Sequence, residues 1–402
     1  MNRYTSAFYL VVALYGPGPG VLHAFQGVSL PLPEGPFRVG TTARQWIDST
    51  RLEGFTSDPH DLRRLDVSVW YPAALRSARS PTPYVPNIDE TESVMGADYA
   101  AHVRSVRTNS TIEPALSRSP ARFPVVVLSH GLGSLPTHYT VLAEELASQG
   151  YLVASINHSF GSAATVLRRR GAQPLHDDWR AAFQISPEAN RFWDDRITDW
   201  AADIVFVINQ LAIENEVATE FFGKRLDLSW VVTIGHSLGG SAALLAGQVD
   251  PRIKAVVNLD GTARNVHTRF PMRVPVLWMQ QDRSMMDSVS AARNLQTSQR
   301  LFRDFMLQLD ANQDTLMSSA QPGSYVVSIR GSYHNHFSDL PVVFGEPDGV
   351  VGFMDPRRAV EIVRTYVVRF LAATLGQADV EELETLGRRF PEVRVLEAQK
   401  RP

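Results

Sequence analysis

The stretch TIGHSLGG at residues 233–240 places a serine between two glycines, directly after an apolar run and directly before the helix-like segment SAALLAG. A sharp turn between a strand and a helix would bring the side chains two positions before and after the serine into collision. Gly235 and Gly239 avoid this collision. The pattern therefore predicts that Ser237 is a nucleophile on such a turn. The alternative is that Ser237 is simply a small residue where a strand meets a helix.

A serine nucleophile also needs N–H donors for the negatively charged oxygen that forms on the attacked carbonyl. On a turn of this kind the backbone N–H of the next residue, here Leu238, is one donor. The loop after an earlier strand supplies the other, and FPVVVLSHGLG at residues 123–133 is a strand-like run followed by two glycines. We expect Leu132 to be the second donor, although HGLG alone would also suit an ordinary tight turn.

A base and an acid that orients it should follow the serine along the chain in the order serine, acid, histidine. The segment GSYHNHFSD at residues 331–339 follows the last strand-like run and offers His334, with His336 as the alternative base. Asp260 and Asp282 each end an apolar run, and position alone leaves both open as the acid. His-x-His could also be half of a metal site, but no third ligand stands at a suitable spacing, so we expect no metal.

Apolar runs of strand length alternate with helical patterns along the chain. Two helix starts are clear, because Ser186-Pro187 and Asp355-Pro356 each place a capping residue before a proline, and Gly376 marks a helix end. This alternation predicts an α/β fold with a mostly parallel central sheet and helices on both faces. The predicted strands are residues 65–72, 123–131, 151–158, 230–236, 253–260, 274–282 and 324–331.

Residues 74–122 and 159–189 interrupt this alternation. Both segments are weakly patterned, and both adjoin the ends of strands that we expect to carry the chemistry. Long excursions of this kind are often lids or substrate-binding loops, and plain surface insertion is an equally weighted alternative. We expect a single domain over residues 25–402 with surface insertions at these two places.

The composition is that of an ordinary globular protein. Of the 402 residues, 44% are hydrophobic and 20% are charged, and the formal net charge of −3 gives no electrostatic reason to expect nucleic acid as a partner. The chain has no cysteine, which excludes disulfides, zinc–cysteine sites and a thiol nucleophile.

The N-terminus has the pattern of an export signal. Arg3 precedes the apolar segment AFYLVVALY at residues 7–15, and Ala24 is a candidate last residue before cleavage. The apolar segment is too short to cross a membrane as a helix. The pattern predicts a signal peptide over residues 1–24 and a secreted or periplasmic mature protein without a transmembrane segment. A buried N-terminal strand is the alternative.

Taken together, FPVVVLSHGLG, GHSLGG, NLDG at residues 258–261 and GSYHNHFSD resemble the secreted platelet-activating-factor acetylhydrolases and their bacterial relatives, within the α/β-hydrolase fold. The resemblance implies that Ser237 is the nucleophile, Asp260 the acid and His334 the base. It also implies that Leu132 and Leu238 supply the two oxyanion donors.

The resemblance implies a carboxylic-ester hydrolase that needs no metal or organic cofactor. Short acyl groups at the sn-2 position of phospholipids are the implied substrates, which allows transient contact with a lipid surface. One alternative is a cutinase-like esterase for polyesters or small aryl or alkyl esters, with Asp282 as the acid. Another is a non-catalytic binding protein on a hydrolase scaffold. The two insertions do not match the family well enough to carry over substrate contacts.

Overall fold

The computed structural model describes residues 27–74, 80–167, 171–179, 185–283, 297–345, 354–376, 383 and 385–399. The predicted signal peptide at residues 1–24 lies outside the described residues. Within the described part of the chain, no helix is long and apolar enough to cross a membrane.

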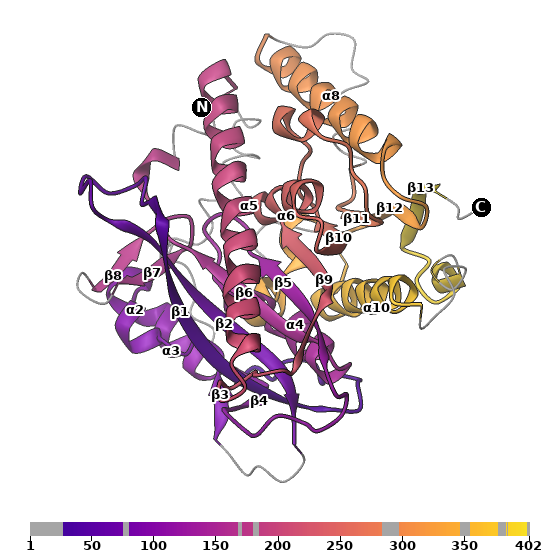
Figure 1. The fold of residues 1–402 in the computed structure, drawn as a ribbon. Coiled ribbons are helices and arrows are strands. Elements are labelled where there is room, and N and C mark those ends of the chain that lie inside the picture. The colour runs from indigo at the N-terminus through magenta and orange to yellow at the C-terminus, as the bar shows by residue number, and fades with distance from the viewer. Residues whose placement is uncertain are drawn as a thin grey trace.

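The described residues form one 11-stranded sheet and a separate two-stranded hairpin (Figure 1). The strands of the large sheet are β1 (Arg38–Leu52), β2 (Leu62–Ala73), β3 (Pro81–Pro83), β4 (Arg107–Ile112), β5 (Phe123–Ser129), β6 (Leu152–His158), β9 (Leu226–His236), β10 (Ile253–Leu259), β11 (Val276–Gln280), β12 (Ser324–Ile329) and β13 (Val393–Gln399). Their order across the sheet is β13-β12-β11-β10-β9-β5-β6-β2-β1-β4-β3.

The centre of the sheet is parallel, as predicted. Strands β6, β5, β9, β10, β11 and β12 all run in the same direction. The chain leaves β5 for β6 on one side and returns through β9 on the other, so the strand order reverses between β5 and β9. Ligand sites in open α/β sheets lie at the carboxyl ends of the strands where this reversal occurs. Ser129 at the end of β5 pairs with Gly235 on β9, and the loops after these strands therefore begin side by side.

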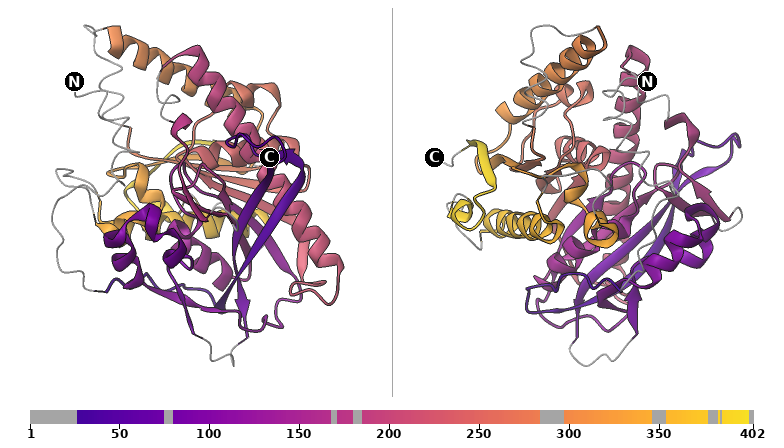
Figure 2. Two further views of the ribbon diagram at one scale, coloured as in Figure 1. Left: turned by 90° about the vertical axis from the view of Figure 1, so that its left-hand side faces the viewer. Right: turned by 180° about the vertical axis from the view of Figure 1, so that it is seen from behind.

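Helices cover both faces of the sheet (Figure 1 and Figure 2). The helices are α2 (Ile88–Met95), α3 (Ala97–Arg104), α4 (Thr140–Ser148), α5 (Pro187–Glu216), α6 (Leu238–Val249), α8 (Thr297–Ser318), α9 (Leu340–Phe344) and α10 (Pro356–Thr374). Short 3-10 turns are η1 (Pro136–Tyr139), η3 (Asn265–Arg269), η4 (His334–Phe337) and η5 (Leu386–Arg388).

Alternate residues of β5 show how the two helical layers divide the sheet. Val125 and Val127 belong to the hydrophobic cluster that contains α5, α6 and α8 side chains. Val126 and Leu128 belong to the cluster that contains α4 and α10 side chains. This alternation is the period of a strand, and it places apolar side chains against helices on each face.

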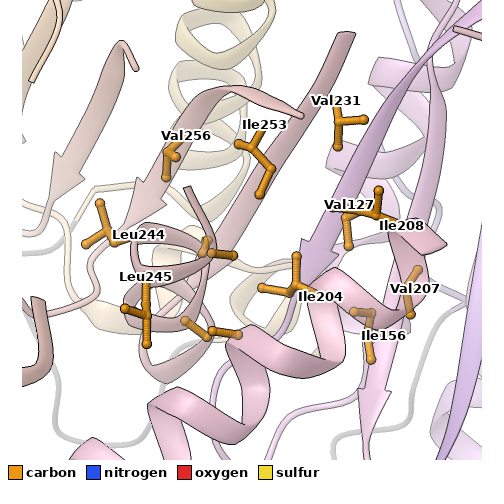
Figure 3. Close-up of a cluster of buried hydrophobic side chains, with 14 of the residues drawn as sticks. Val127, Ile156, Ile204, Val207, Ile208, Val231, Leu244, Leu245, Ile253 and Val256 are labelled. Atoms are coloured by element: carbon orange, nitrogen blue, oxygen red, sulfur yellow. The ribbon is translucent and has the colours of Figure 1, made fainter. Parts of the chain in front are cut away.

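Branched aliphatic side chains build the core beneath α5 and α6 (Figure 3). Ile204, Val207 and Ile208 lie at helical spacing on α5 and are completely buried. Full burial of one such side chain contributes about 1.5–3 kcal/mol. This packing fixes α5 and α6 against the central strands, and it therefore also fixes the loops that join them.

Two predicted helix starts and one predicted helix end are confirmed. The Ser186 side chain caps α5 by accepting a hydrogen bond from the Ala189 N–H at 3.1 Å. Asp355 caps α10 by accepting from the Arg357 N–H at 2.9 Å. Gly376 follows α10 with a φ of 72°, a conformation that glycine adopts without a Cβ clash.

The two segments that interrupt the alternation contain regular structure. In the first, β4 pairs with β1 and extends the sheet, while α2 and α3 pack into a small cluster with Tyr84, Ile88 and Val103. In the second, β7 (Ala164–Leu167) and β8 (Gly171–Pro174) form the hairpin, which contacts α2. The two segments therefore meet each other. A lid role for either stays a prediction.

Candidate active site

Ser237 stands at the sharp turn between β9 and α6. Its backbone angles are φ 55° and ψ −123°, a conformation that costs a non-glycine residue about 1–3 kcal/mol. A Cβ on Gly235 would overlap the carbonyl of Gly239, and a Cβ on Gly239 would overlap the carbonyls of Ser129 and His130. Glycine at both positions therefore permits this close turn, and it leaves Ser237 partly exposed in front of α6.

His334 and Asp260 come together although they lie on different loops. The ring nitrogen Nδ1 of His334 is 2.6 Å from Oδ2 of Asp260. The other carboxylate oxygen of Asp260 accepts a hydrogen bond from the Gln281 N–H at 2.9 Å. Since Nδ1 donates its proton to the carboxylate, Nε2 is the nitrogen left free to accept one, as a general base requires.

His334 also lies beside the turn that carries the serine. His236, the residue before Ser237, donates from Nε2 to the backbone carbonyl of His334 at 3.0 Å. The centroids of the two imidazole rings are 4.5 Å apart. These contacts bring Ser237, His334 and Asp260, the predicted nucleophile, base and acid, together at the carboxyl ends of the central strands.

Asp282 binds the backbone of the turn that leads to His334. Its Oδ2 accepts a hydrogen bond from the Gly331 N–H at 2.8 Å, and its own N–H donates to the Ser332 carbonyl at 3.2 Å. The Nδ1 of His334 is already hydrogen-bonded to Asp260. The geometry thus favours Asp260 over Asp282 as the acid that orients the base.

The alternative base, His336, belongs to the interior of the η4 turn. Its side chain is buried, and its Nδ1 accepts a hydrogen bond from the Tyr333 N–H at 3.1 Å. The Tyr333 ring packs edge-on against it, with centroids 4.3 Å apart. Among the described residues, no group of three or more His, Asp or Glu side chains is placed to hold a metal ion.

The loop after β5 lies directly against Ser237, because a Cβ on Gly131 would stand 3.3 Å from the Ser237 Cβ. The Gly131 carbonyl accepts two hydrogen bonds, from Nδ1 of His130 at 2.7 Å and from the Ser134 N–H at 3.0 Å. The C=O and N–H of a trans peptide point in opposite directions. Holding the Gly131 carbonyl therefore turns the Leu132 N–H to the opposite side of that peptide.

A chain of buried hydrogen bonds joins this loop to the serine turn and to the base. The Gly131 N–H donates to the Tyr139 hydroxyl at 2.9 Å, and that hydroxyl donates to Nδ1 of His236 at 2.8 Å. His236 then donates to His334, as described above. Burial lowers the pKa of His236 well below its ordinary value, so the ring stays neutral, as these hydrogen bonds require.

A second serine–histidine–aspartate arrangement lies beneath the site. Ser129 donates to Nε2 of His158 at 2.8 Å, and Nδ1 of His158 donates to Asp203 at 2.8 Å. All three side chains are completely buried, so no substrate reaches them. Burial alone would raise the pKa of Asp203, but the Arg63 charge and the His158 hydrogen bond lower it below the ordinary value. This group belongs to the core that supports the loop after β5.

Comparison with known proteins identifies the family. A profile of the family "Platelet-activating factor acetylhydrolase, isoform II" matches residues 22–191 and 202–388. The chain belongs to this family. Its members take their name from an ester-cleaving activity, and the sequence resemblance to them is confirmed.

Individual members of the platelet-activating-factor acetylhydrolase family are distant from this chain. The platelet-activating factor acetylhydrolase of Canis lupus familiaris is 24% identical over 306 residues, which cover 69% of this chain and 64% of that protein. The Cavia porcellus protein is 21% identical, covering 89% of this chain and 80% of its own. A probable 1-alkyl-2-acetylglycerophosphocholine esterase of Arthroderma benhamiae is 22% identical, with 92% and 94% covered.

The fold of this family member matches that of a solved esterase. A ferulic acid esterase from Streptomyces cinnamoneus superposes with a TM-score of 0.72 and 22% identity, covering 92% of this chain and 100% of that one. The predicted α/β-hydrolase fold is thereby confirmed. In this architecture the strand order reverses at β5, which lies between β6 and β9, and this reversal positions the site.

Sequence reasoning missed three residues that hold the site together. His130 and His236 stand inside the quoted motifs, directly before the predicted oxyanion loop and the serine, and their polar character in buried positions was a usable signal. Tyr139 gave no signal, because nothing in the spacing shows that its hydroxyl reaches both of the other segments.

Proposed function

We propose that this chain is a serine carboxylic-ester hydrolase that forms an acyl-enzyme on Ser237. The observation that carries the proposal is the hydrogen bond from His334 Nδ1 to Asp260, on a loop that also contacts the residue before Ser237. This arrangement provides a nucleophile, a base and a group that fixes the tautomer of the base. A binding protein on the same scaffold would not need all three.

The proposed reaction has two halves. Nε2 of His334 takes the proton of the Ser237 hydroxyl as its oxygen attacks the ester carbonyl, and the N–H groups of Leu132 and Leu238 stabilise the oxyanion. His334 then gives the proton to the leaving alcohol. Water enters, His334 takes a proton from it, and the acid is released when the proton returns to Ser237. Asp260 stabilises the charged imidazolium in both halves.

We propose esters with short acyl groups as substrates, including sn-2 acetyl groups of phospholipids. The family profile and the names of the relatives support this class. The cutinase-like alternative needs Asp282 as the acid, and the bond between His334 and Asp260 argues against it. No metal or organic cofactor enters the proposed chemistry.

We further propose a secreted or periplasmic location and a single catalytic domain over residues 25–402. The location rests on the signal-like pattern of residues 1–24. Lipid esters as substrates would bring the protein into transient contact with a lipid surface.

An ester panel tests the substrate class. Nitrophenyl esters from acetyl to octanoyl, and an sn-2-acetyl phospholipid beside its long-acyl counterpart, are compared by kcat/KM, with Ser237→Ala as the baseline. We expect the highest kcat/KM for acetyl esters and a steady fall with acyl length. A preference for long acyl chains would contradict the substrate class, and no turnover by folded protein would contradict ester hydrolysis itself.

A further inference from the structure

Arg264 is a buried cation that the proposed reaction does not use. It lies in the loop that follows Asp260, and only 8% of the residue is exposed. Its guanidinium carbon is 4.8 Å from the ring centroid of Trp193 on α5 and 5.4 Å from that of Phe305 on α8. The two aromatic rings therefore hold a positive charge at a fixed place.

This guanidinium has unused hydrogen-bonding capacity. An arginine carries five N–H donors. Within the described residues the side chain of Arg264 donates one hydrogen bond, to Oδ1 of Asn190 at 3.3 Å, and forms no ion pair with a carboxylate. Burial lowers the pKa of Arg264 to about 10, partly offset by the charge of Asp194, so the group is still positively charged at neutral pH. A buried cation with free donors is costly unless an anion completes it.

Contacts of Arg264's own loop and of the Trp193 ring beside it lead to the two loops of the proposed site. On its own loop, a Cβ at Gly261 would overlap the Ser237 carbonyl region, so the loop packs directly on the serine turn. The Trp193 ring also contacts Trp179, with centroids 5.7 Å apart. Trp179 comes from the same segment as Leu175, whose side chain lies against Gly133 of the loop after β5.

The two helices that contact Arg264, α5 and α8, extend past the end of the sheet at which the proposed site lies. α8 and the N-terminal half of α5 both project beyond the sheet, at the end where α6 begins (Figure 1 and Figure 2). The ends of the parallel strands that carry Ser237 and Asp260 face the same way. Arg264 follows β10 and therefore lies at this same end of the sheet, where the ester is proposed to bind.

We propose that Arg264 binds an anionic group, a phosphodiester or a carboxylate, on one arm of the ester substrate. The proposal rests on the ester-hydrolase function proposed above. A guanidinium fork matches the paired oxygens of both anions, and a nearly buried position strengthens the interaction. Trp193 and Phe305 orient the fork before the substrate arrives, which reduces the entropy lost on binding.

Matched ester pairs test this proposal. The first pair is nitrophenyl pentanoate and the mono-nitrophenyl ester of glutaric acid, which differ by a carboxylate in place of a methyl group. The second is an sn-2-acetyl glycerophosphocholine and the matching sn-2-acetyl glycerol without the phosphodiester. The proteins are the wild type, Arg264→Gln, Arg264→Lys and the control Arg252→Gln, whose guanidinium pairs with Asp250 in the turn between α6 and β10.

We expect Arg264→Gln to lower kcat/KM about 10- to 100-fold for the anionic member of a pair and less than about threefold for the neutral member. Arg264→Lys should keep part of the preference, because it keeps the charge and loses the fork. The ester pair whose anionic-to-neutral ratio falls in Arg264→Gln shows whether the bound anion is a carboxylate or a phosphodiester. Arg252→Gln should leave both ratios unchanged.

Equal losses of kcat/KM on the anionic and neutral members would overturn the proposal and assign Arg264 to packing. No loss of kcat/KM on either member would overturn it as well. If Arg264→Gln fails to fold, an unchanged anionic-to-neutral ratio in Arg264→Lys overturns it equally. Wild-type turnover of nitrophenyl acetate is scored separately. Its absence would reject the ester-hydrolase function, whereas its presence with unchanged ratios would reject only the role of Arg264.

Discussion

Ser237 and Asp260 share an unusual backbone conformation, with φ values of 55° and 53°. Each directly follows a parallel strand, and each N–H is held by the next strand in the sheet. The Ser237 N–H donates to the Leu259 carbonyl at 2.9 Å, and the Asp260 N–H donates to the Met279 carbonyl at 2.7 Å. Positive φ in a non-glycine residue persists where neighbouring structure over-determines it. Ser237 and Asp260, the proposed nucleophile and acid, are therefore held rigidly by the sheet itself.

Substituting each of the two candidate acids would disrupt a different hydrogen bond. Asp260→Asn removes the carboxylate that fixes the tautomer of His334, and we expect kcat on nitrophenyl acetate to fall about 10³- to 10⁴-fold. Asp282→Asn weakens the hydrogen bond to the Gly331 N–H, and we expect a loss of about 1–2 kcal/mol in the free energy of unfolding with kcat within about tenfold of wild type. The reverse pattern would support the cutinase-like alternative.

At the scale of the elements, η1 joins segments that are remote in sequence. The Tyr139 hydroxyl on this turn accepts from the Gly131 N–H and donates to His236, so the loop after β5 and the serine turn share one hydroxyl group. His130 and His236 are both buried, and burial lowers the pKa of each well below its ordinary value. The network stays neutral and does not compete with His334 for the proton.

Removing this hydroxyl tests its positioning role. We expect Tyr139→Phe to lower kcat about tenfold with little change in KM, because the loop that carries the proposed oxyanion donor Leu132 loosens while substrate contacts stay. The Gly131 N–H loses its partner, which should cost about 1–3 kcal/mol in the free energy of unfolding.

Tyr366→Phe is the matched control. Within the described part of the chain, the buried Tyr366 hydroxyl has no hydrogen-bond partner, so its removal should change neither kcat nor stability. A Tyr139→Phe enzyme that loses stability but keeps its kcat would reduce Tyr139 to a structural residue.

At the scale of the whole molecule, the sequence predicted the central strands of the sheet well and the strands toward its edge poorly. Strands buried on both faces, such as β5 and β10, are continuous apolar runs, and their ends were predicted to within two residues. The 15-residue β1 is polar along most of its length and gave no such signal. It forms because it pairs with β2 along that length, a tertiary effect that local pattern does not contain.

The site was predictable to the extent that it follows chain order. The serine turn and the histidine loop each stand next to a recognisable strand, so Ser237 and His334 could be named from the sequence. Asp260 and Asp282 follow neighbouring parallel strands, and spacing alone could not show which carboxylate reaches the imidazole. Arg264 could not be found at all, because its aromatic neighbours come from α5 and α8.

The central claim is that His334 activates Ser237, and the rate of labelling by a fluorophosphonate probe measures this directly. We expect one label per chain, located at Ser237 by peptide mass spectrometry, no label on Ser237→Ala, and labelling about 10²-fold slower or more on His334→Ala. His336→Asn, which keeps an acceptor for the Tyr333 N–H, should label at nearly the wild-type rate. A folded protein that is not labelled, or that is labelled elsewhere, would contradict the account.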